Sequence, residues 1–395
     1  MRTLNRYLLK EITVPFFLSL IIFTFVLLLD RMMQLIELVV GRGVHISDIG
    51  MLIVYIIPSF LTLTIPMSFL LALLLAFGRL SSDGEVTAMK ASGVSLYQML
   101  IPVTVLSILA YIMTFYLFLF ALPWGNQSFR VKVFDIASAR ASTAIKEGVF
   151  NDDFEGIVLY VEKFENAGER MQGIMIYDQR EKEEYAIFAR DGSILSDPEA
   201  MTVTMYLKNG EIHKVGKRLS YDRVAFSTYD MRLNFKGPDS GKKGEVSKGD
   251  REMTLAELRE RVAELKARGE NHGPYDVEIY KKFAIPFACI VFGLIGAPLG
   301  IQSKRSGRAW GFSLSLAIFL VYYISLTGGE SLGDRGVIPP LLAIWGANII
   351  FFFLGVYLIL MVGKERPIPL LAWMDRAMDF IERLPKRLKS WKKER

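Results

Sequence analysis

Between Ile49 and Phe77 the chain reads IGMLIVYIIPSFLTLTIPMSFLLALLLAF, without a single Asp, Glu, Lys or Arg. A helix crosses the hydrocarbon core of a bilayer with about 20 apolar residues, so this stretch can span a membrane. Five further stretches are equally uncharged and apolar: Ile12–Leu29, Val94–Phe129, Phe283–Ser303, Ala309–Gly329 and Gly336–Gly363. We therefore predict a polytopic α-helical membrane protein with six transmembrane helices, three before and three after a polar insert.

The insert between the third and fourth apolar stretches has a different period. From about residue 150 to 235 apolar and polar residues alternate, as in Gly156–Glu162 (GIVLYVE) and Met201–Leu207 (MTVTMYL). Such alternation is typical of strands. Turn-like breaks separate the runs: Asn166-Ala167-Gly168, Asp191-Gly192, Ser196-Asp197-Pro198 and Asn209-Gly210. Short strands at this spacing predict an inserted all-β domain of the sandwich or jellyroll class.

A polar linker at residues 237–250 follows the strands, and then a helix with clear ends. Thr254 and Glu257 have the spacing of a capping box, and Gly269 is a natural stop. An apolar stripe follows the cap: Leu255, Leu258, Val262 and Leu265. We interpret residues 254–268 as an amphipathic helix that lies against the strand domain or the membrane surface.

The chain therefore divides into four regions. Residues 1–129 hold transmembrane helices 1–3, and residues 130–273 hold the β-domain, linker and amphipathic helix. Residues 274–363 hold helices 4–6, and residues 364–395 form a basic tail. The termini and the loops on their side carry 18 Lys and Arg, whereas the short loops on the other side carry three. By the positive-inside rule both termini are cytoplasmic, and the β-domain lies outside.

The loop after the second span predicts a short cytoplasmic helix over residues 82–93. Ser82 and Glu85 have capping-box spacing, and Gly93 is a stop. Ser95 and Gln98 then cap the third span. One face of the short helix carries Glu85, Ala88, Met89 and Ser92. The pattern fits either a plain connector or a coupling helix that receives force from a separate cytoplasmic ATPase.

Motifs for chemistry are missing from the sequence. It contains no G-x-x-x-x-G-K-[ST], H-E-x-x-H or G-x-S-x-G. The one cysteine, Cys289, lies in the fourth stretch, and the three histidines are far apart. We predict no catalytic, cofactor or metal site. Because no charged residue lies in mid-span, the pattern disfavours an ion-coupled carrier and favours an external energy source.

Charges remain at the outer edges of the spans. Arg31 and Arg42 follow span 1, Arg335 lies between spans 5 and 6, and Lys281-Lys282 precedes the fourth apolar stretch. Such cations ordinarily snorkel to lipid headgroups. The alternative is that they meet the phosphates of an amphiphile held between the helices.

The order of elements resembles the LptF/LptG permeases of lipopolysaccharide export. Three segments carry the resemblance: Asn5–Glu11 (NRYLLKE), Glu85–Gly93 (EVTAMKASG), and Lys281–Cys289 (KKFAIPFAC) continuing to Gly296–Gly300 (GAPLG). The N-terminus and the placement of Asp30-Arg31 favour the LptF-like over the LptG-like member. The resemblance covers the whole chain and implies a bacterial inner-membrane protein with a periplasmic β-jellyroll.

The resemblance also implies partners and roles. A sister permease would pair with this chain, an LptB-like ATPase dimer would drive both, and a single-span LptC-like protein would accept lipopolysaccharide from the jellyroll. Glu85 matches the family's coupling-helix glutamate, which contacts the ATPase. Arg31 takes roughly the place of a basic residue that meets the charged groups of the substrate. The competing hypothesis from the residues is a membrane-anchored scaffold that binds an envelope protein without transporting lipid.

Overall fold

A computed structural model describes residues 2–40, 46–144, 147–154, 156–165, 170–180, 185–197, 202–215, 221–233, 249, 252–302 and 308–366. The chain divides into two compact units. The helical unit comprises Met1–Leu38, Ile56–Gly125 and Gly249–Arg395, and the β unit comprises Val39–Tyr55 and Asn126–Lys248. Each unit is described by itself below.

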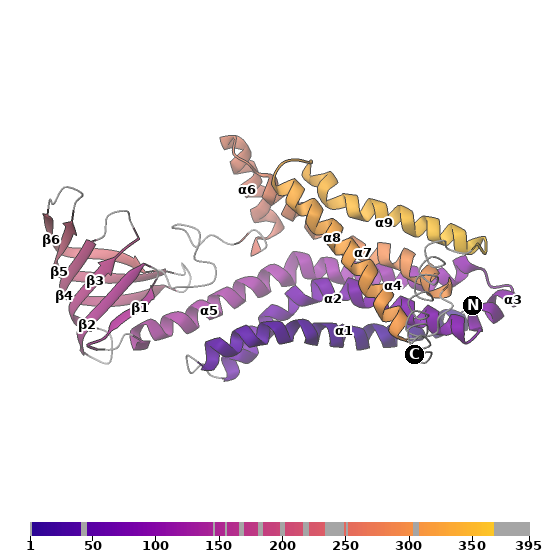
Figure 1. Cartoon of the computed structure of the whole chain (residues 1–395), viewed down its shortest axis with the longest axis horizontal. Coiled ribbons are helices and arrows are strands. Elements are labelled where there is room, and N and C mark those ends of the chain that lie inside the picture. Colours follow the sequence, from indigo (N-terminus) through magenta and orange to yellow (C-terminus); the bar gives the residue numbers. More distant parts are fainter. Residues whose placement is uncertain are drawn as a thin grey trace, which may run out of the picture. The chain divides into compact units, whose positions relative to one another are not determined.

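Long helices build the first unit (Figure 1): α1 (Arg2–Val40), α2 (Ile46–Ser82), α3 (Glu85–Ala91), α4 (Leu96–Tyr116), α6 (Leu255–Arg268), α7 (Gly273–Gln302), α8 (Arg308–Asp334) and α9 (Pro340–Gly363). Six helices of the described chain are long and apolar enough to cross a membrane: Arg2–Met33, Ser47–Ser82, Leu96–Ile136, Gly273–Gln302, Trp310–Asp334 and Pro340–Gly363. The predicted six-helix membrane protein with an inserted β-domain is confirmed.

Helix α7 lies at the centre of the helical unit and packs against α4, α6, α8 and α9. Three of its glycines allow close approach to neighbouring helices. A Cβ at Gly293 would lie 2.1 Å from the Ser107 hydroxyl oxygen of α4, and a Cβ at Gly300 would lie 2.7 Å from Phe77 Cβ of α2. Gly296 faces Leu73 in the same way. In membranes, small residues at such contacts let helix backbones pack closely, since lipid provides no hydrophobic drive for association.

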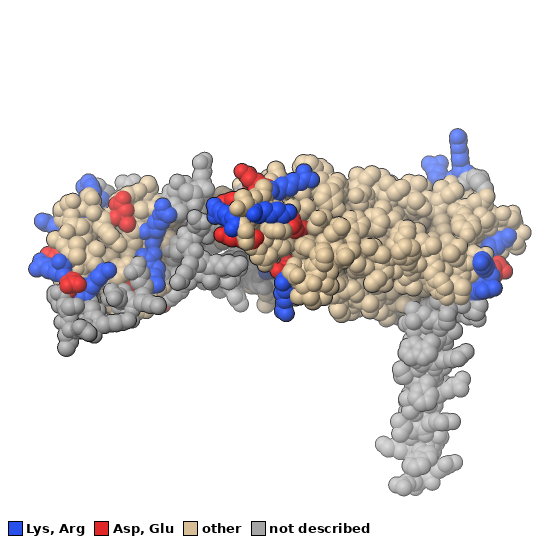
Figure 2. Space-filling view, turned by 90° about the horizontal axis from the view of Figure 1, so that it is seen from above, with Lys and Arg blue, Asp and Glu red and all other residues tan. Residues whose placement is uncertain are grey.

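The two ends of this unit differ. At one end, the Ser81 hydroxyl of α2 donates to the Ile301 carbonyl of α7, and the Gln302 amide donates to the Arg366 carbonyl after α9. This is the α3 end. Helix α6 packs at the other end of α7, about 40 Å away at 1.5 Å per residue. On the face drawn in Figure 2, charged side chains of this unit gather at its two ends and leave an uncharged band between them.

The helical segment that begins with α4 continues past the predicted end of the third span at Phe129. A π-helical turn, η1 (Leu117–Ala121), leads into α5 (Leu122–Ala144). Pro123 has no N–H to donate to the preceding turn, and the wider π turn accommodates its ring. In the β unit, Lys132 of α5 pairs with Asp48 of α2 at 2.9 Å, and Phe134 packs against the core of the sheet.

One antiparallel sheet of six strands, in the order of the sequence, forms the β unit: β1 (Phe150–Phe154), β2 (Ile157–Glu165), β3 (Arg170–Asp178), β4 (Tyr185–Asp197), β5 (Thr202–Val215) and β6 (Tyr221–Leu233). The described strands form an up-and-down meander, and the Greek-key crossings of a full jellyroll are not among them. Apolar residues of all six strands meet in one buried core on the inner face of the sheet.

Two predicted turns were wrong. Asp191-Gly192 lies inside β4 and Asn209-Gly210 lies inside β5, because these strands pair along nearly their whole length. Asn209 has a φ of 55° and falls between the paired residues Lys208 and Gly210, and the register is the same on both sides of it. A Cβ at Gly210 would lie 2.4 Å from the Phe188 carbonyl oxygen. The residues that suggested a break are therefore those that allow a left-handed backbone conformation and close packing within a continuous strand.

Candidate functional site

The short helix after α2 is smaller than predicted and begins differently. Ser82 belongs to α2, where its hydroxyl donates to the Arg79 carbonyl, and α3 begins at Glu85 after Gly84 with a φ of 75°. The predicted Ser82–Glu85 capping box was therefore wrong: Gly84, in the left-handed region, reverses the chain without a side-chain cap. The stop at Gly93 (φ 85°) and the capping box of Ser95 and Gln98 are confirmed.

The predicted face of α3 is only partly free. Val86 is buried, and Met89 packs against the same apolar core, so these two side chains anchor the helix. Ala88 and Ser92 are exposed, and the Ser92 hydroxyl donates to the Ala88 carbonyl. Glu85 is half-buried at the beginning of the helix. Of the four predicted residues, three reach solvent and Met89 serves the anchor.

Glu85 contacts the first turns of α1. The Tyr7 hydroxyl donates to Glu85 Oε2 at 2.7 Å, and Arg79 Nη2 donates to the same hydroxyl at 3.4 Å. Arg79 Nη2 also pairs with Glu11 Oε2 at 2.8 Å, and its Nε lies 3.8 Å from Asp83. This Glu85 cluster (Tyr7, Glu11, Arg79, Asp83 and Glu85) joins α1, the end of α2 and α3.

The proposed headgroup arginines are not assembled into a described site. Arg31 is an exposed residue of α1, and Arg335 is exposed in the turn after α8. Arg42 lies outside the described residues. Their role in binding substrate therefore stays a prediction.

Lys281 and Lys282 do not snorkel as predicted. Lys281 is only 7% exposed, and its Nζ lies 2.8 Å from carboxylate oxygens of both Glu278 and Glu330. Helix α7 begins ten residues before Phe283, which places these charges inside the packed end of α7 and α8. Lys282 is fully buried, and within the described chain its Nζ has no hydrogen-bond partner. The correction follows from tertiary packing: acidic residues of α7 and α8 supply a counter-charge that the isolated span lacks.

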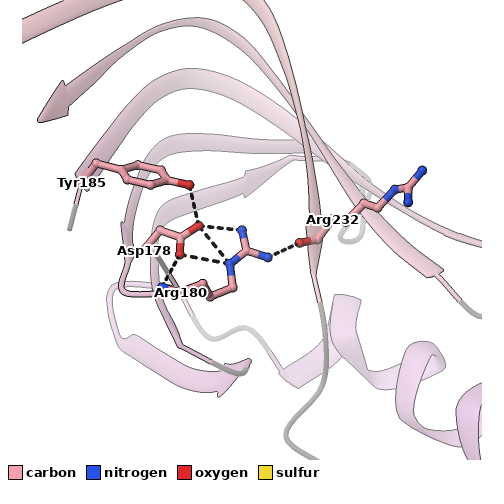
Figure 3. Close-up of polar contacts among 4 residues, drawn as sticks. All are labelled: Asp178, Arg180, Tyr185 and Arg232. Carbon is pink, nitrogen blue, oxygen red and sulfur yellow. Dashed lines mark hydrogen bonds and ion pairs between the residues drawn. The ribbon is translucent and has the colours of Figure 1, made fainter. Parts of the chain in front are cut away.

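A second polar cluster lies in the β unit (Figure 3). Asp178, at the end of β3, has no exposed side-chain surface, and its carboxylate accepts hydrogen bonds from the Arg180 side chain, the Arg180 backbone N–H and the Tyr185 hydroxyl. Arg180 Nη1 donates to the Arg232 carbonyl of β6 at 2.7 Å. A Cβ at Gly156 would lie 2.9 Å from Arg180 Cγ, so Arg180 reaches from the β1–β2 turn to β6. We call Asp178, Arg180 and Tyr185 the β-clasp.

The electrostatics of the β-clasp follow from burial. Desolvation by itself raises the pKa of the Asp178 carboxyl, but the hydrogen bonds and charge of Arg180 outweigh it and hold that pKa below its ordinary value. The hydrogen bond to Asp178 raises the pKa of the Arg180 guanidinium. Burial, followed by the charge of Asp178, raises the pKa of the Tyr185 hydroxyl. At neutral pH the β-clasp is thus an ion pair completed by a neutral phenol.

No group of three His, Cys, Asp or Glu residues within the described parts of the chain is placed to hold a metal ion. The three histidines differ in their surroundings. His272 pairs with Asp276 at 2.8 Å, and His213 lies near Glu211 and edge-on to Phe188, whereas His45 lies outside the described residues.

Sequence comparison relates this architecture to one family. The family model for the lipopolysaccharide export system permease LptF/LptG matches residues 6–361, which include both helix triplets and the sheet. The chain belongs to the LptF/LptG family.

Curated relatives of both family names match this LptF/LptG family member. The lipopolysaccharide export system permease protein LptF of Escherichia coli K12 is 20% identical over 359 residues, 89% of this chain and 93% of the relative. LptG of the same strain is 22% identical over 321 residues, 79% of this chain and 85% of the relative. An uncharacterized protein of Rickettsia prowazekii is 22% identical over 263 residues, 64% of this chain and 70% of the relative. The comparison shows the family and not which member.

Sequence reasoning missed most of the Glu85 cluster and the β-clasp of this family member. Tyr7 and Glu11 lie in the N-terminal motif that carries the resemblance, but nothing in that motif indicates a partner 78 residues further along the chain. Asp178 and Arg180 are separated by one residue, and this spacing does not by itself predict an ion pair. The one available signal was Tyr7 itself, a polar aromatic residue between the apolar Leu8 and basic Arg6 at the start of a span.

Proposed function

We propose that the chain is a permease subunit of an ATP-driven lipopolysaccharide exporter, and that a separate LptB-like ATPase dimer supplies the energy at α3. The observation that carries this is the family match over both helix triplets and the inserted sheet. The family and the six apolar helices make the chain a multi-pass protein of the inner membrane and a transporter component, not itself an enzyme.

The proposed orientation places the α3 end in the cytoplasm and the β unit in the periplasm. Of the Lys and Arg in the termini and short loops, 18 fall on the side of the two termini and three on the opposite side. This bias is the positive-inside pattern, and large domains translocate largely regardless of their charge. The proposed periplasmic position of the sheet follows, because three spans separate it from each terminus and an odd number of crossings changes sides.

Energy would enter through α3. Val86 and Met89 anchor the helix to the core, while Glu85, Ala88 and Ser92 face outward. A short helix that is anchored to the core and exposes small side chains and one carboxylate suits docking to a soluble ATPase that contacts it with a basic residue. Because Val86 and Met89 fix α3 to the core, a displacement of α3 moves the packed helices with it.

A sister permease would complete the lipid cavity. Helix α1 exposes the apolar side chains of Phe17, Leu18 and Ile21, and α8 exposes those of Val321 and Ile324. Such faces suit acyl chains or a second permease. We propose that movement of the two subunits narrows a shared apolar cavity and drives the lipid towards the β unit, where an LptC-like protein accepts it. Moving acyl chains into water costs about 0.8 kcal/mol per CH₂, so an apolar inner sheet face is a physically suitable receiver.

The decisive experiment is co-expression of the chain with a candidate ATPase and sister permease, purification of the complex, and reconstitution into vesicles that contain lipopolysaccharide. We expect ATP-dependent release of lipopolysaccharide to a soluble acceptor. Glu85→Gln should abolish coupled release, whereas Glu260→Gln, an exposed glutamate of α6, should not. Full activity of Glu85→Gln would refute energy entry at α3.

The route through the β unit can be tested with matched photo-crosslinkers. Ile187 faces the buried inner side of β4, and its neighbour Phe188 faces the outer side. A crosslinker at position 187 should capture lipopolysaccharide during ATP turnover, and one at position 188 should not. Capture at neither position, with an intact complex, would instead favour a membrane-anchored scaffold that transports no lipid.

A further inference from the structure

The first turns of α1 and the start of α3 are joined by one phenol. The Tyr7 hydroxyl donates to Glu85 Oε2 at 2.7 Å and accepts from Arg79 Nη2 at 3.4 Å. A hydroxyl can do both, because it carries one donor and two acceptor lone pairs. Arg79 is held in place in turn by Glu11, one helical turn further along α1, at 2.8 Å. Two residues of α1, Tyr7 and Glu11, therefore bind residues on both sides of the turn between α2 and α3.

The same helices share apolar packing beneath these polar contacts. Leu8 and Ile12 of α1 are fully buried in one cluster with Leu80 of α2 and Val86 of α3. Apolar packing holds surfaces together but is not directional. A hydrogen bond is directional and weakens steeply away from linear geometry. The Tyr7–Glu85 hydrogen bond therefore fixes the orientation of α3 against α1, which apolar packing alone does not determine.

Glu85 keeps part of its carboxylate for another partner. Its described hydrogen bond uses Oε2, and within the described residues Oε1 has no partner. An ionised carboxylate has two oxygens and about four acceptor sites. Glu85 can therefore hold Tyr7 through one oxygen while the other meets a basic side chain of a docked protein.

We propose that Tyr7 is a positioning residue that makes α1 move together with α3 when the ATPase acts on the short helix. The proposal rests on the proposed function of α3 as the point of energy entry. The covalent route from α3 to α4 passes through Gly93, whose φ of 85° marks a turn. The lateral contact through Tyr7 is direct and does not pass through this turn. Displacement of α3 therefore reaches α1, whose apolar window is 22% buried, the smallest share among the six described spans, through Glu85 and Tyr7.

The first test measures coupling in the reconstituted complex with Tyr7→Phe, which keeps the ring and removes the hydroxyl. The ATPase should still co-purify, and ATP hydrolysis should remain within about 2-fold of the wild type. The lipopolysaccharide released per ATP hydrolysed should fall about 2- to 10-fold, the factor expected for one hydrogen bond. The control is Tyr97→Phe, an exposed tyrosine of α4, which should leave this ratio unchanged.

The second test measures the motion directly, with a readout that a merely structural role would not change. Spin labels at Arg2→Cys in α1 and Ala91→Cys in α3 report the α1–α3 distance, because the one native cysteine, Cys289, is buried. In the wild-type background this distance should stay the same between the nucleotide-free and ATP-trapped complexes. With Tyr7→Phe the distance should change on ATP trapping, since α3 then moves without α1.

An unchanged coupling ratio in Tyr7→Phe, or an α1–α3 distance that changes on ATP trapping in the wild type, would overturn the inference and leave the proposed function intact. A wild-type complex that binds the ATPase and releases no lipopolysaccharide would instead overturn the proposed function. The two failures are therefore distinguishable in one set of samples.

Discussion

Replacing Arg180 with Met should loosen the sheet at β6. The substitution keeps an apolar side chain that can lie on Gly156 but removes the guanidinium from the fully buried Asp178 carboxylate. The Asp178 carboxylate then keeps two described hydrogen-bond donors, the backbone N–H of residue 180 and the Tyr185 hydroxyl. The Arg232 carbonyl of β6 loses the donor at 2.7 Å.

The expected cost follows from burial. Removing one partner of a fully buried ion pair costs about 3–5 kcal/mol. The Arg180 side chain is 30% exposed, which weakens the pair through solvent screening, so we expect about 3 kcal/mol. The double variant Asp178→Asn with Arg180→Met leaves no buried charge and should cost less than the single variant. Arg190→Met, an exposed arginine of β4, should change stability by less than about 0.5 kcal/mol.

Hydrogen exchange of the full-length chain in detergent measures this loss locally. A loss of about 3 kcal/mol should speed exchange of the slowest β6 amides roughly 100-fold. Exchange in α7 should stay unchanged, because it belongs to the other compact unit. Equal β6 protection in wild type and Arg180→Met would refute the reasoning.

The pH dependence of the stability difference between wild type and Arg180→Met is an independent test. The folded-state pKa of Asp178 lies below its unfolded value of about 3.9, so the ion pair stabilises the wild type above that pH and is lost as the pH falls through the folded pKa. In Arg180→Met burial without a cation should raise the same pKa. The variant therefore gains stability on acidification, and its deficit should be largest at neutral pH and narrow towards pH 4. A deficit that grows on acidification would contradict this.

Two further substitutions test the packing of the helical unit. Gly300→Ala places a Cβ 2.7 Å from Phe77 Cβ and should lower the free energy of unfolding by about 1–3 kcal/mol, whereas Gly346→Ala, with nothing within 4 Å in the described structure, should be tolerated. Thermal unfolding of the purified chain compares the two variants, and equal midpoints would contradict the close approach of α2 and α7. Lys281→Met removes the cation between two carboxylates and should lower the free energy of unfolding by about 3–5 kcal/mol. Adding Glu330→Gln should restore part of that stability, and a double variant as unstable as Lys281→Met would show that the ion pair does not cause the effect.

Local features were predictable from the sequence because their cause lies within a few residues. The capping boxes at Ser95 and Thr254 and the left-handed stops at Gly93 and Gly269 are present as expected. The failed cap at Ser82 shows the limit: the same spacing occurs, but α2 keeps Ser82 in its last turn and Gly84 makes the reversal. A spacing motif fixes a cap only when the preceding helix does not compete for the same residue.

Composition also determined the large-scale architecture. Apolar length decides whether a helix can span a bilayer, and alternation decides whether a strand can bury one face, so six spans and an inserted sheet followed from the residues alone. Tertiary structure decided which polar groups meet. Tyr7 and Glu85, Arg180 and Arg232, and Lys281 and Glu330 lie 78, 52 and 49 residues apart. No periodicity records such pairs, because each forms only when packing brings separate elements within hydrogen-bond distance.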